Sequence, residues 1–329
     1  MPLRSVARST PILLVSLALV VAALVAACGQ DNPEVTASPG SSTSSPDETG
    51  TAGEAGFPVS VTGDNGEVTL ETQPERIVSL SPTATEMLFA IEADGAVVAV
   101  DDNSNFPPAA PVTDLSGFTP NLEAIAAYDP DLVVLSTDTG DVVAGLEAIG
   151  IAVLQLDAVE DLDGTYRQIE VLGAATGHVG DAAEVVAEMR SDIDELVATV
   201  PDREVPLTYY HELDDLLFTV TSSTFIGEMY ALAGLENIAD ATAADGDDYP
   251  QLASEYVVAQ DPDLIFLADT KCCGQSADTL MARPGWGQLR ALRDGGVHEL
   301  DDDVASRWGP RVVDFLGVIV EATAMVPAR

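Results

Sequence analysis

The chain of 329 residues is poor in cationic side chains, in cysteine and in histidine. It has 13 Lys and Arg against 55 Asp and Glu, a formal net charge of −42. Binding of nucleic acid needs a basic surface, and no stretch of this chain supplies one. Three Cys and three His exclude a cysteine-rich zinc module and a disulfide-dense small domain. Because 47% of the residues are apolar, the composition predicts an acidic globular protein with a sizeable core.

The sequence motifs of common enzyme classes are also missing. There is no Gly-x-Ser-x-Gly elbow, no P-loop, no dinucleotide glycine motif and no metalloprotease helix. Ser222, Ser223 and His211 could be assembled with an Asp into a nucleophile and base, but so many carboxylates produce such sets by chance. The three histidines, His178, His211 and His298, are too scattered for a metal site. We therefore predict no catalytic residue, no metal site and no cofactor of its own.

The first 28 residues have the features of a secretion signal that ends at a lipid-attachment site. Arg4 and Arg8 precede the apolar run of residues 11–27, and small residues precede Cys28. The Val-Ala-Ala-Cys-Gly sequence resembles the lipobox of bacterial lipoproteins, whose cysteine is acylated before cleavage. The resemblance implies loss of residues 1–27 and anchoring of Cys28 in the lipid bilayer, on the extracytoplasmic face of the cell membrane. A membrane-spanning anchor with an incidental cysteine is the alternative, since the run is near the lower limit for a span.

Residues 28–56 predict a disordered tether. They contain Gly, Ser, Thr, Pro and acidic residues, with scarcely a large apolar side chain. Such a segment cannot bury enough surface to offset the entropy of ordering it. A tether of this kind would keep the folded part within reach of a membrane partner.

From Phe57 onward, short β-branched runs alternate with helical patterns, which predicts an α/β fold with parallel sheets. The same plan occurs twice, in residues 122–135 and again in 254–267. In both copies a helix is followed by an Asp-Pro-Asp turn and a buried strand. We therefore predict two lobes of like design.

A long helix is predicted between the lobes. Apolar residues recur at helical spacing over residues 181–200, and Pro201 ends the pattern. One helix joining two lobes would act as a stiff spine, so only small motion between them is expected. The predicted domains are an N-terminal lobe (57–170), a linking helix region (171–203) and a C-terminal lobe (204–329).

This arrangement resembles the helical-backbone class of substrate-binding proteins of ABC importers, the family that captures iron-siderophores, haem and vitamin B12. The resemblance covers nearly all of residues 74–323. It depends on Pro-Glu-Arg-Ile-Val-Ser-Leu-Ser-Pro at 74–82, Thr85-Glu86, both Asp-Pro-Asp-Leu segments, and Phe-Ile-Gly-Glu at 225–228 before Gly234. It implies periplasmic-binding-protein class III: two Rossmann-like lobes with parallel sheets, joined by one long backbone helix. It also implies a monomer whose partners are an ABC permease dimer and a bulky metal chelate.

Three further segments resemble the vitamin B12-binding members of this family. They are Asn-Phe-Pro-Pro-Ala at 105–109, Tyr-Pro-Gln at 249–251, and Ser-Arg-Trp-Gly-Pro-Arg at 306–311. Cobalamin or another corrinoid is therefore favoured as ligand over a ferric siderophore or haem. The alternatives of a different class are a hydrolase or a sensory lipoprotein on the same scaffold.

Glu86 and Glu228 occupy corresponding places in the two lobes, each near the start of a predicted helix. The helix dipole favours a carboxylate near the start of a helix, so helix-end electrostatics alone could account for both residues. The family resemblance implies a second role, in which one Glu from each lobe docks into arginine-lined sockets on the two permease subunits.

The ligand cleft is expected where loops at the strand ends of the two lobes face each other. Rings and polar groups in those loops offer broad contact to a flat macrocycle. Tyr209 is equally compatible with a place in the core, and Asp303 with a helix cap. Arg311 is explained more simply by an ion pair at the start of a helix. Phe118 departs from the Trp of the vitamin B12-binding members. The candidate ligand contacts are Asn105, Phe106, Phe118, Tyr209, Tyr210, His211, Tyr249, Asp303, Arg307 and Trp308.

Cys272 and Cys273 are neighbours in the loop after a predicted strand. If Cys28 is acylated, they are the only remaining thiols in an oxidising compartment. A disulfide between them is the first expectation. Two free thiols, or thiolate ligation of a bound metal centre, are the alternatives.

Overall fold

The computed structural model of the protein describes residues 56–244 and 246–327. The predicted signal, acylated Cys28 and tether lie outside the described residues. Within the described part, no helix has the length and apolar composition that crossing a membrane requires.

The N-terminal sheet has four parallel strands in the order β4-β3-β5-β6. Its strands are apolar runs, and β3 and β5 are buried throughout, as expected when helices cover both faces of a parallel sheet. An antiparallel hairpin precedes it, made of β1 (Val59–Gly63) and β2 (Gly66–Leu70). The other elements are β3 (Ile77–Leu80), α1 (Pro82–Ala90), η1 (Asp94–Ala96), β4 (Val97–Val100), α2 (Leu122–Ala126), β5 (Leu132–Leu135), α3 (Val142–Ala148), β6 (Ala152–Gln155) and α4 (Leu162–Thr176).

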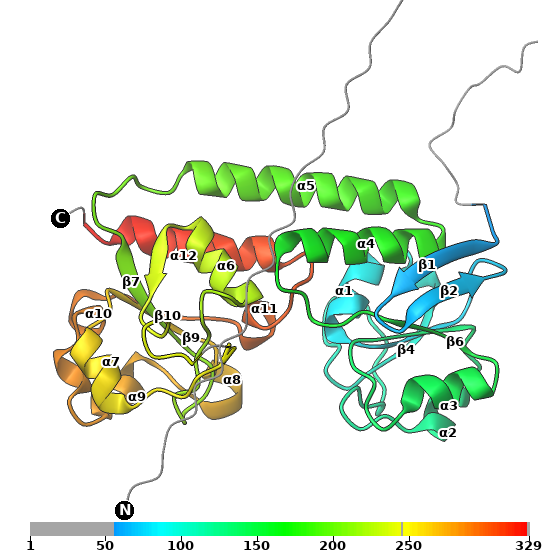
Figure 1. The fold of residues 1–329 in the computed structure, drawn as a ribbon, viewed down its shortest axis with the longest axis horizontal. Coiled ribbons are helices and arrows are strands. Elements are labelled where there is room, and N and C mark those ends of the chain that lie inside the picture. Colours follow the sequence, from blue (N-terminus) through cyan, green and yellow to red (C-terminus); the bar gives the residue numbers. More distant parts are fainter. Residues whose placement is uncertain (1–55, 245, 328–329) are drawn as a thin grey trace, which may run out of the picture. The chain divides into compact units, whose positions relative to one another are not determined.

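The C-terminal sheet repeats the plan, with parallel strands in the order β10-β9-β7-β8. The presence of two separate parallel sheets confirms the predicted fold class (Figure 1). Helix α5 (Val179–Ala198) joins the two halves. The elements that follow are β7 (Leu207–Glu212), α6 (Phe225–Leu232), β8 (Leu235–Asn237), α7 (Ser254–Gln260), β9 (Leu264–Leu267), α8 (Thr270–Cys273), α9 (Ala277–Ala282), η2 (Trp286–Gln288), α10 (Arg290–Asp294), β10 (Val297–Glu299), α11 (Asp302–Ala305) and α12 (Val312–Met325).

In each sheet, successive strands are added first on one side of the first central strand and then on its other side. In the first sheet the chain passes from β3 to β4 on one side, and then to β5 on the other side. In the second it passes from β7 to β8 and then to β9 in the same way. The loops that leave the carboxyl ends of such strand pairs diverge, and the crevice between them is where open α/β sheets bind ligands. We call the ends of β3 and β5, and of β7 and β9, the two switch points.

The duplicated Asp-Pro-Asp turn explains how each sheet is built. Its first residue is left-handed in both copies, with φ of 50° at Asp129 and 46° at Asp261, a conformation that Asp tolerates better than most residues. Its second Asp accepts hydrogen bonds from the chain at the central strand: Asp131 from the backbone N–H groups of Glu75 (2.8 Å) and Arg76 (3.0 Å), and Asp263 from that of Thr208 (3.1 Å). The repeat therefore ties the strand that follows it to the central strand of the same sheet.

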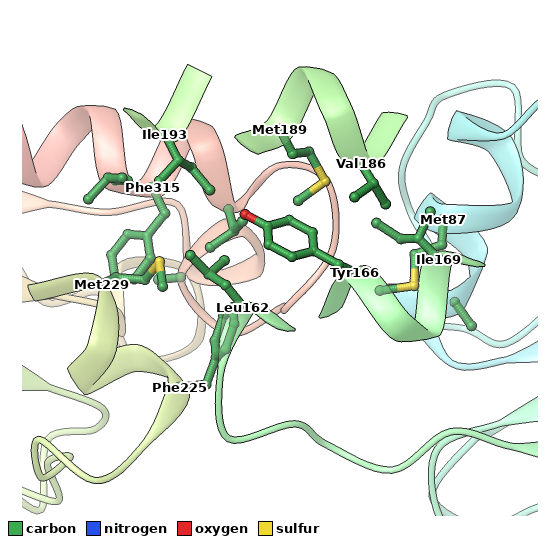
Figure 2. Packing of buried hydrophobic residues seen from close by; sticks show 14 of the residues in the cluster. Met87, Leu162, Tyr166, Ile169, Val186, Met189, Ile193, Phe225, Met229 and Phe315 are labelled. Atoms are coloured by element: carbon green, nitrogen blue, oxygen red, sulfur yellow. The ribbon is translucent and has the colours of Figure 1, made fainter. Parts of the chain in front are cut away.

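Helices α4, α5 and α12 connect the halves through one apolar core. Helix α5 packs against α4 and α12 and runs past both sheets (Figure 1). Figure 2 shows the Tyr166 ring of α4 beside Met189 of α5, with its hydroxyl toward the side where Met229 and Phe315 of the C-terminal half lie. Because this core is continuous, a wide hinge opening would expose apolar surface to water. The predicted lobe boundary at residue 170 falls inside α4, so this helix belongs to the connection as much as to the N-terminal lobe.

Candidate functional site

Four of the predicted ligand contacts lie together where the two lobes meet. Asn105 and Phe106 come from the segment after β4, while Asp303 and Arg307 come from α11 and the turn after it. The Asn105 amide donates to the Asp303 carboxylate (3.0 Å), and Arg307 donates to Asn105 (3.0 Å) and to Asp303 (3.0 Å). Loops that follow strands of both sheets are thus joined by a polar bridge.

A buried ion cluster centred on Glu86 continues this bridge. The Glu86 side chain, 2% exposed, accepts from Arg307 Nη1 at 2.8 Å and from Arg311 Nε at 2.9 Å. The Arg311 guanidinium also lies over the Phe106 ring, 4.1 Å from its centroid. Glu86 sits on α1 and both arginines on the C-terminal side, so the cluster fastens one half to the other. In this arrangement the carboxylate predicted to dock with a permease is not presented to the surface.

Glu228 makes the reciprocal contact from the C-terminal half. It lies in the first turn of α6, and its carboxylate accepts from the backbone N–H of Leu162 (2.9 Å) at the start of α4. Burial raises the pKa of Glu228, the Leu162 hydrogen bond opposes that rise, and Asp161 and Asp163 add to it. Each Glu of the predicted docking pair therefore holds the other half of the molecule.

The structure contradicts the predicted ligand contacts of Tyr209, Tyr210 and His211. All three lie on β7 and are fully buried. Tyr209 stacks on Tyr230 with ring centroids 3.9 Å apart, and His211 Nδ1 is 2.7 Å from the Tyr230 hydroxyl. Burial lowers the pKa of His211 to about 3, so the ring is neutral. The physical reason is that a central parallel strand is covered on both faces, so successive side chains are all in the core.

Trp308 is also a structural residue in this arrangement. Its indole N–H donates to the Gln168 side chain of α4 (2.8 Å), and the ring packs against the main apolar core. Its ring is partly buried and supports the junction between the halves, and a ligand contact by the remaining surface stays a prediction.

Two predicted contacts remain exposed beside the switch points. Phe118 is 77% exposed and Tyr249 is 54% exposed. Gly117, next to Phe118, passes so close to the end of β3 that a Cβ there would lie 2.5 Å from the Leu80 carbonyl oxygen. The chain beside Tyr249 bonds to the loop after β7, through Thr219 N–H to the Pro250 carbonyl at 3.0 Å. Both rings thus stand near the carboxyl ends of central strands.

Sequence reasoning missed a charged cluster at the C-terminal switch point. Arg283 makes a forked pair with Glu212 at the end of β7, with both N–O distances 2.6 Å. Asp269 follows β9, is fully buried, and has no hydrogen-bond partner for either carboxylate oxygen among the described residues. Burial and the neighbouring Glu212 raise the pKa of Asp269 to about 7. A proton on Asp269 that bonds to Glu212 would satisfy both carboxyl groups. The sequence did contain a signal for this cluster: an acidic residue lies at or just after the end of two apolar strands, Glu212 at the end of β7 and Asp269 two residues after β9.

The disulfide turn is the next feature along the chain. A disulfide joins Cys272 and Cys273 in α8, and both residues are exposed. The Asp302 carboxylate accepts the backbone N–H groups of Thr270 (3.0 Å), Lys271 (2.8 Å) and Cys272 (3.1 Å). With these sulfurs paired with each other, neither is a thiolate ligand. Among the described residues, no cluster of His, Cys, Asp and Glu is arranged to hold a metal ion.

A cavity of about 810 Å³ lies elsewhere, between the β1–β2 hairpin, the loop after β6 and α4. None of the predicted ligand contacts lines it. The exposed rings and the polar bridge therefore lie outside this cavity, in loops that follow the strands of the two sheets.

Two parallel α/β sheets joined by long helices, with rings and polar groups at the carboxyl ends of their strands, define a two-lobed binding protein. The family model described as periplasmic binding protein matches residues 77–304, and the chain belongs to that family. A cobalamin-binding protein of Halobacterium salinarum is 33% identical over 273 residues, which cover 78% of this chain and 72% of that protein. The ABC transporter substrate-binding lipoprotein YvrC of Bacillus subtilis is 29% identical, over 81% of this chain and 85% of YvrC. Among solved structures, the periplasmic vitamin B12 binding protein BtuF of Vibrio cholerae matches with a TM-score of 0.64 at 25% identity, covering 76% of this chain and 97% of BtuF.

Proposed function

We propose that this protein is the extracytoplasmic substrate-binding lipoprotein of an ABC importer, and that it captures cobalamin or a related corrinoid. The observation that carries the ligand assignment is the 33% identity to a cobalamin-binding protein, which extends over both lobes. The protein acts by capture and delivery, with no chemical step on the ligand.

Affinity comes mainly from exposed ring surfaces in the loops that follow the strands of the two sheets. Phe118 and Tyr249 are largely exposed and Phe106 is 38% exposed, so each has surface left to bury against a ligand. Burying an aromatic side chain fully contributes about 1.5–3 kcal/mol, and a bulky macrocycle reaches rings on both lobes. Polar groups at the bridge, Asn105 and Asp303, fix the orientation of the ligand.

Delivery couples docking to the junction between the halves. Glu86 and Glu228 are already engaged across that junction, so arginines of a permease would have to displace Arg307 and Arg311 from Glu86. Separating a buried ion pair costs about 3–5 kcal/mol when one charge is left alone, but an incoming arginine replaces the lost partner. Docking therefore loosens the contact that holds the halves together, which favours release of the ligand.

Ligand capture is tested by titrating the full chain, purified in detergent, with cyanocobalamin in a calorimeter. We expect one site per chain, with haem and a ferric hydroxamate binding much more weakly. Tighter binding of haem or of the ferric hydroxamate would overturn the corrinoid assignment. Failure of all three to bind would overturn capture of a metal chelate.

Docking is tested in membranes that contain the partner permease. The double variant Glu86→Gln, Glu228→Gln should co-purify with the permease at least about tenfold less well than wild type, since two charged contacts are lost. Glu195→Gln, an exposed Glu on α5, is the matched control and should behave as wild type. Undiminished co-purification and transport by the double variant would refute the docking role.

A further inference from the structure

The disulfide turn occupies the C-terminal switch point. Helix α8 begins three residues after β9 ends, so Cys272 and Cys273 belong to the segment that leaves the carboxyl end of a central strand. In Figure 1, α8 lies on the side of the C-terminal lobe that faces the other lobe. This is the position at which open α/β sheets present their ligand contacts.

Hydrogen bonds and ion pairs hold the disulfide turn in place and connect it to the junction between the halves. Asp302 accepts three successive backbone N–H groups at the start of α8. Lys271 Nζ pairs with Asp301 and, at 2.7 Å, with Asp303, whose carboxylate in turn holds Asn105 of the N-terminal lobe. Although burial opposes it, the bonds from Lys271 and Asn105 hold the pKa of Asp303 below its ordinary value, so the link stays charged. The pair between Lys271 and Asp303 thus joins the turn directly to the polar bridge.

The chemistry of the turn differs from everything around it. The neighbouring side chains Asp301, Asp302 and Asp303 are acidic and Lys271 is basic. A disulfide carries no charge and no hydrogen on sulfur, so it cannot donate a hydrogen bond to water. The disulfide is therefore an exposed, uncharged group among charged side chains. Sulfur is also polarisable and makes favourable contacts with the edges of conjugated rings.

We propose that the Cys272–Cys273 disulfide is part of the ligand-binding surface of the C-terminal lobe and packs against the apolar rim of the captured chelate. This inference rests on the proposed function. The contact is non-covalent, and because both sulfurs are oxidised they do not coordinate the metal centre. The disulfide adds one apolar contact to those of the exposed rings Phe106, Phe118 and Tyr249.

The test compares cyanocobalamin binding by the full chain and by the double variant Cys272→Ser, Cys273→Ser. Losing this contact should weaken binding about tenfold, equal to about 1.4 kcal/mol. Val205→Ser is the matched control: Val205 is 74% exposed and lies before β7, at the opposite end of the sheet, so its replacement should leave the affinity unchanged. Thermal unfolding of each variant shows whether it is folded.

A second measurement covers the case in which the double variant does not fold. The single variant Cys272→Ser leaves Cys273 as a free thiol, and mass spectrometry locates the alkylation at Cys273, apart from Cys28, and follows its rate. Saturating cyanocobalamin should slow that alkylation severalfold. Wild-type affinity in the double variant, or an unchanged alkylation rate with cyanocobalamin bound, would overturn the inference and leave the proposed function intact. If the wild-type chain binds none of cyanocobalamin, haem and a ferric hydroxamate, the proposed function is refuted, and so is this inference, which rests on it.

Discussion

The buried carboxyl group of Asp269 makes the stability of this protein depend on pH in a defined direction. An Asp in an unfolded chain titrates near 3.8, whereas burial beside Glu212 raises the pKa of Asp269 to about 7. Between these values the folded chain keeps a proton that the unfolded chain releases. Stability contributed by this group is therefore complete below about pH 4, falls as the pH rises toward 7, and is constant above that.

The size of the effect follows from the shift. One pKa unit corresponds to about 1.4 kcal/mol, so a shift of this size costs at most about 4 kcal/mol. This pKa already includes the opposing effect of Arg283, and because Asp269 and Glu212 interact, the net cost is about 2–4 kcal/mol. Asp269→Asn replaces the carboxyl group with an uncharged amide that donates to Glu212 at every pH. At pH 8 this variant should be about 2–4 kcal/mol more stable than wild type, and at pH 4 about equal to it.

The assay is urea unfolding at pH 4, 5, 6, 7 and 8, followed by tryptophan fluorescence. Other carboxyl groups also titrate, but they cancel in the difference between wild type and variant. Asp192→Asn, an exposed Asp on α5, is the control and should track wild type at each pH. A difference between Asp269→Asn and wild type that is the same at pH 4 and pH 8 would refute the reasoning.

Three other changes test the site and the anchor. Phe118→Ala should weaken cyanocobalamin binding about tenfold by calorimetry, whereas Tyr209→Phe, in the core, should leave it unchanged; the reverse result would contradict the placement of these rings. Arg307→Met should lower the free energy of unfolding by about 2–3 kcal/mol in urea, since Glu86 keeps Arg311 but the Asn105 and Asp303 contacts are lost; a loss below about 0.5 kcal/mol would show that the bridge contributes little. Cys28→Ser should move the chain from the membrane fraction to the soluble fraction, and retention in the membrane would argue for a spanning anchor.

The strands and the duplicated turn could be predicted because their causes are local. A run such as Leu132–Leu135 is apolar throughout, which indicates a strand buried on both faces. The Asp-Pro-Asp turn fixes its own backbone, and its copy 132 residues later indicates a second sheet. Helix α5 followed in the same way from apolar spacing and a terminating proline.

The site was harder to predict because its causes are not local. Glu86 pairs with Arg307 and Arg311, which are 221 and 225 residues away, and no spacing rule links positions so far apart. Tyr209 and His211 have polar atoms that suggest ligand contact, yet each finds its partner inside the core. Whether a polar aromatic residue serves a ligand or the interior depends on what covers its strand, and only the assembled fold determines that.

The shared interior of α4, α5 and α12 limits how this protein could be engineered. A fragment cut off after β6 would lose the three helices and leave the inner face of α1, with Met87, in water. Neither half is thus suited to separate expression or to split-reporter designs. An inserted fluorescent domain for a corrinoid sensor belongs in a surface loop away from the proposed ligand contacts, such as the one near Val205, which is 74% exposed.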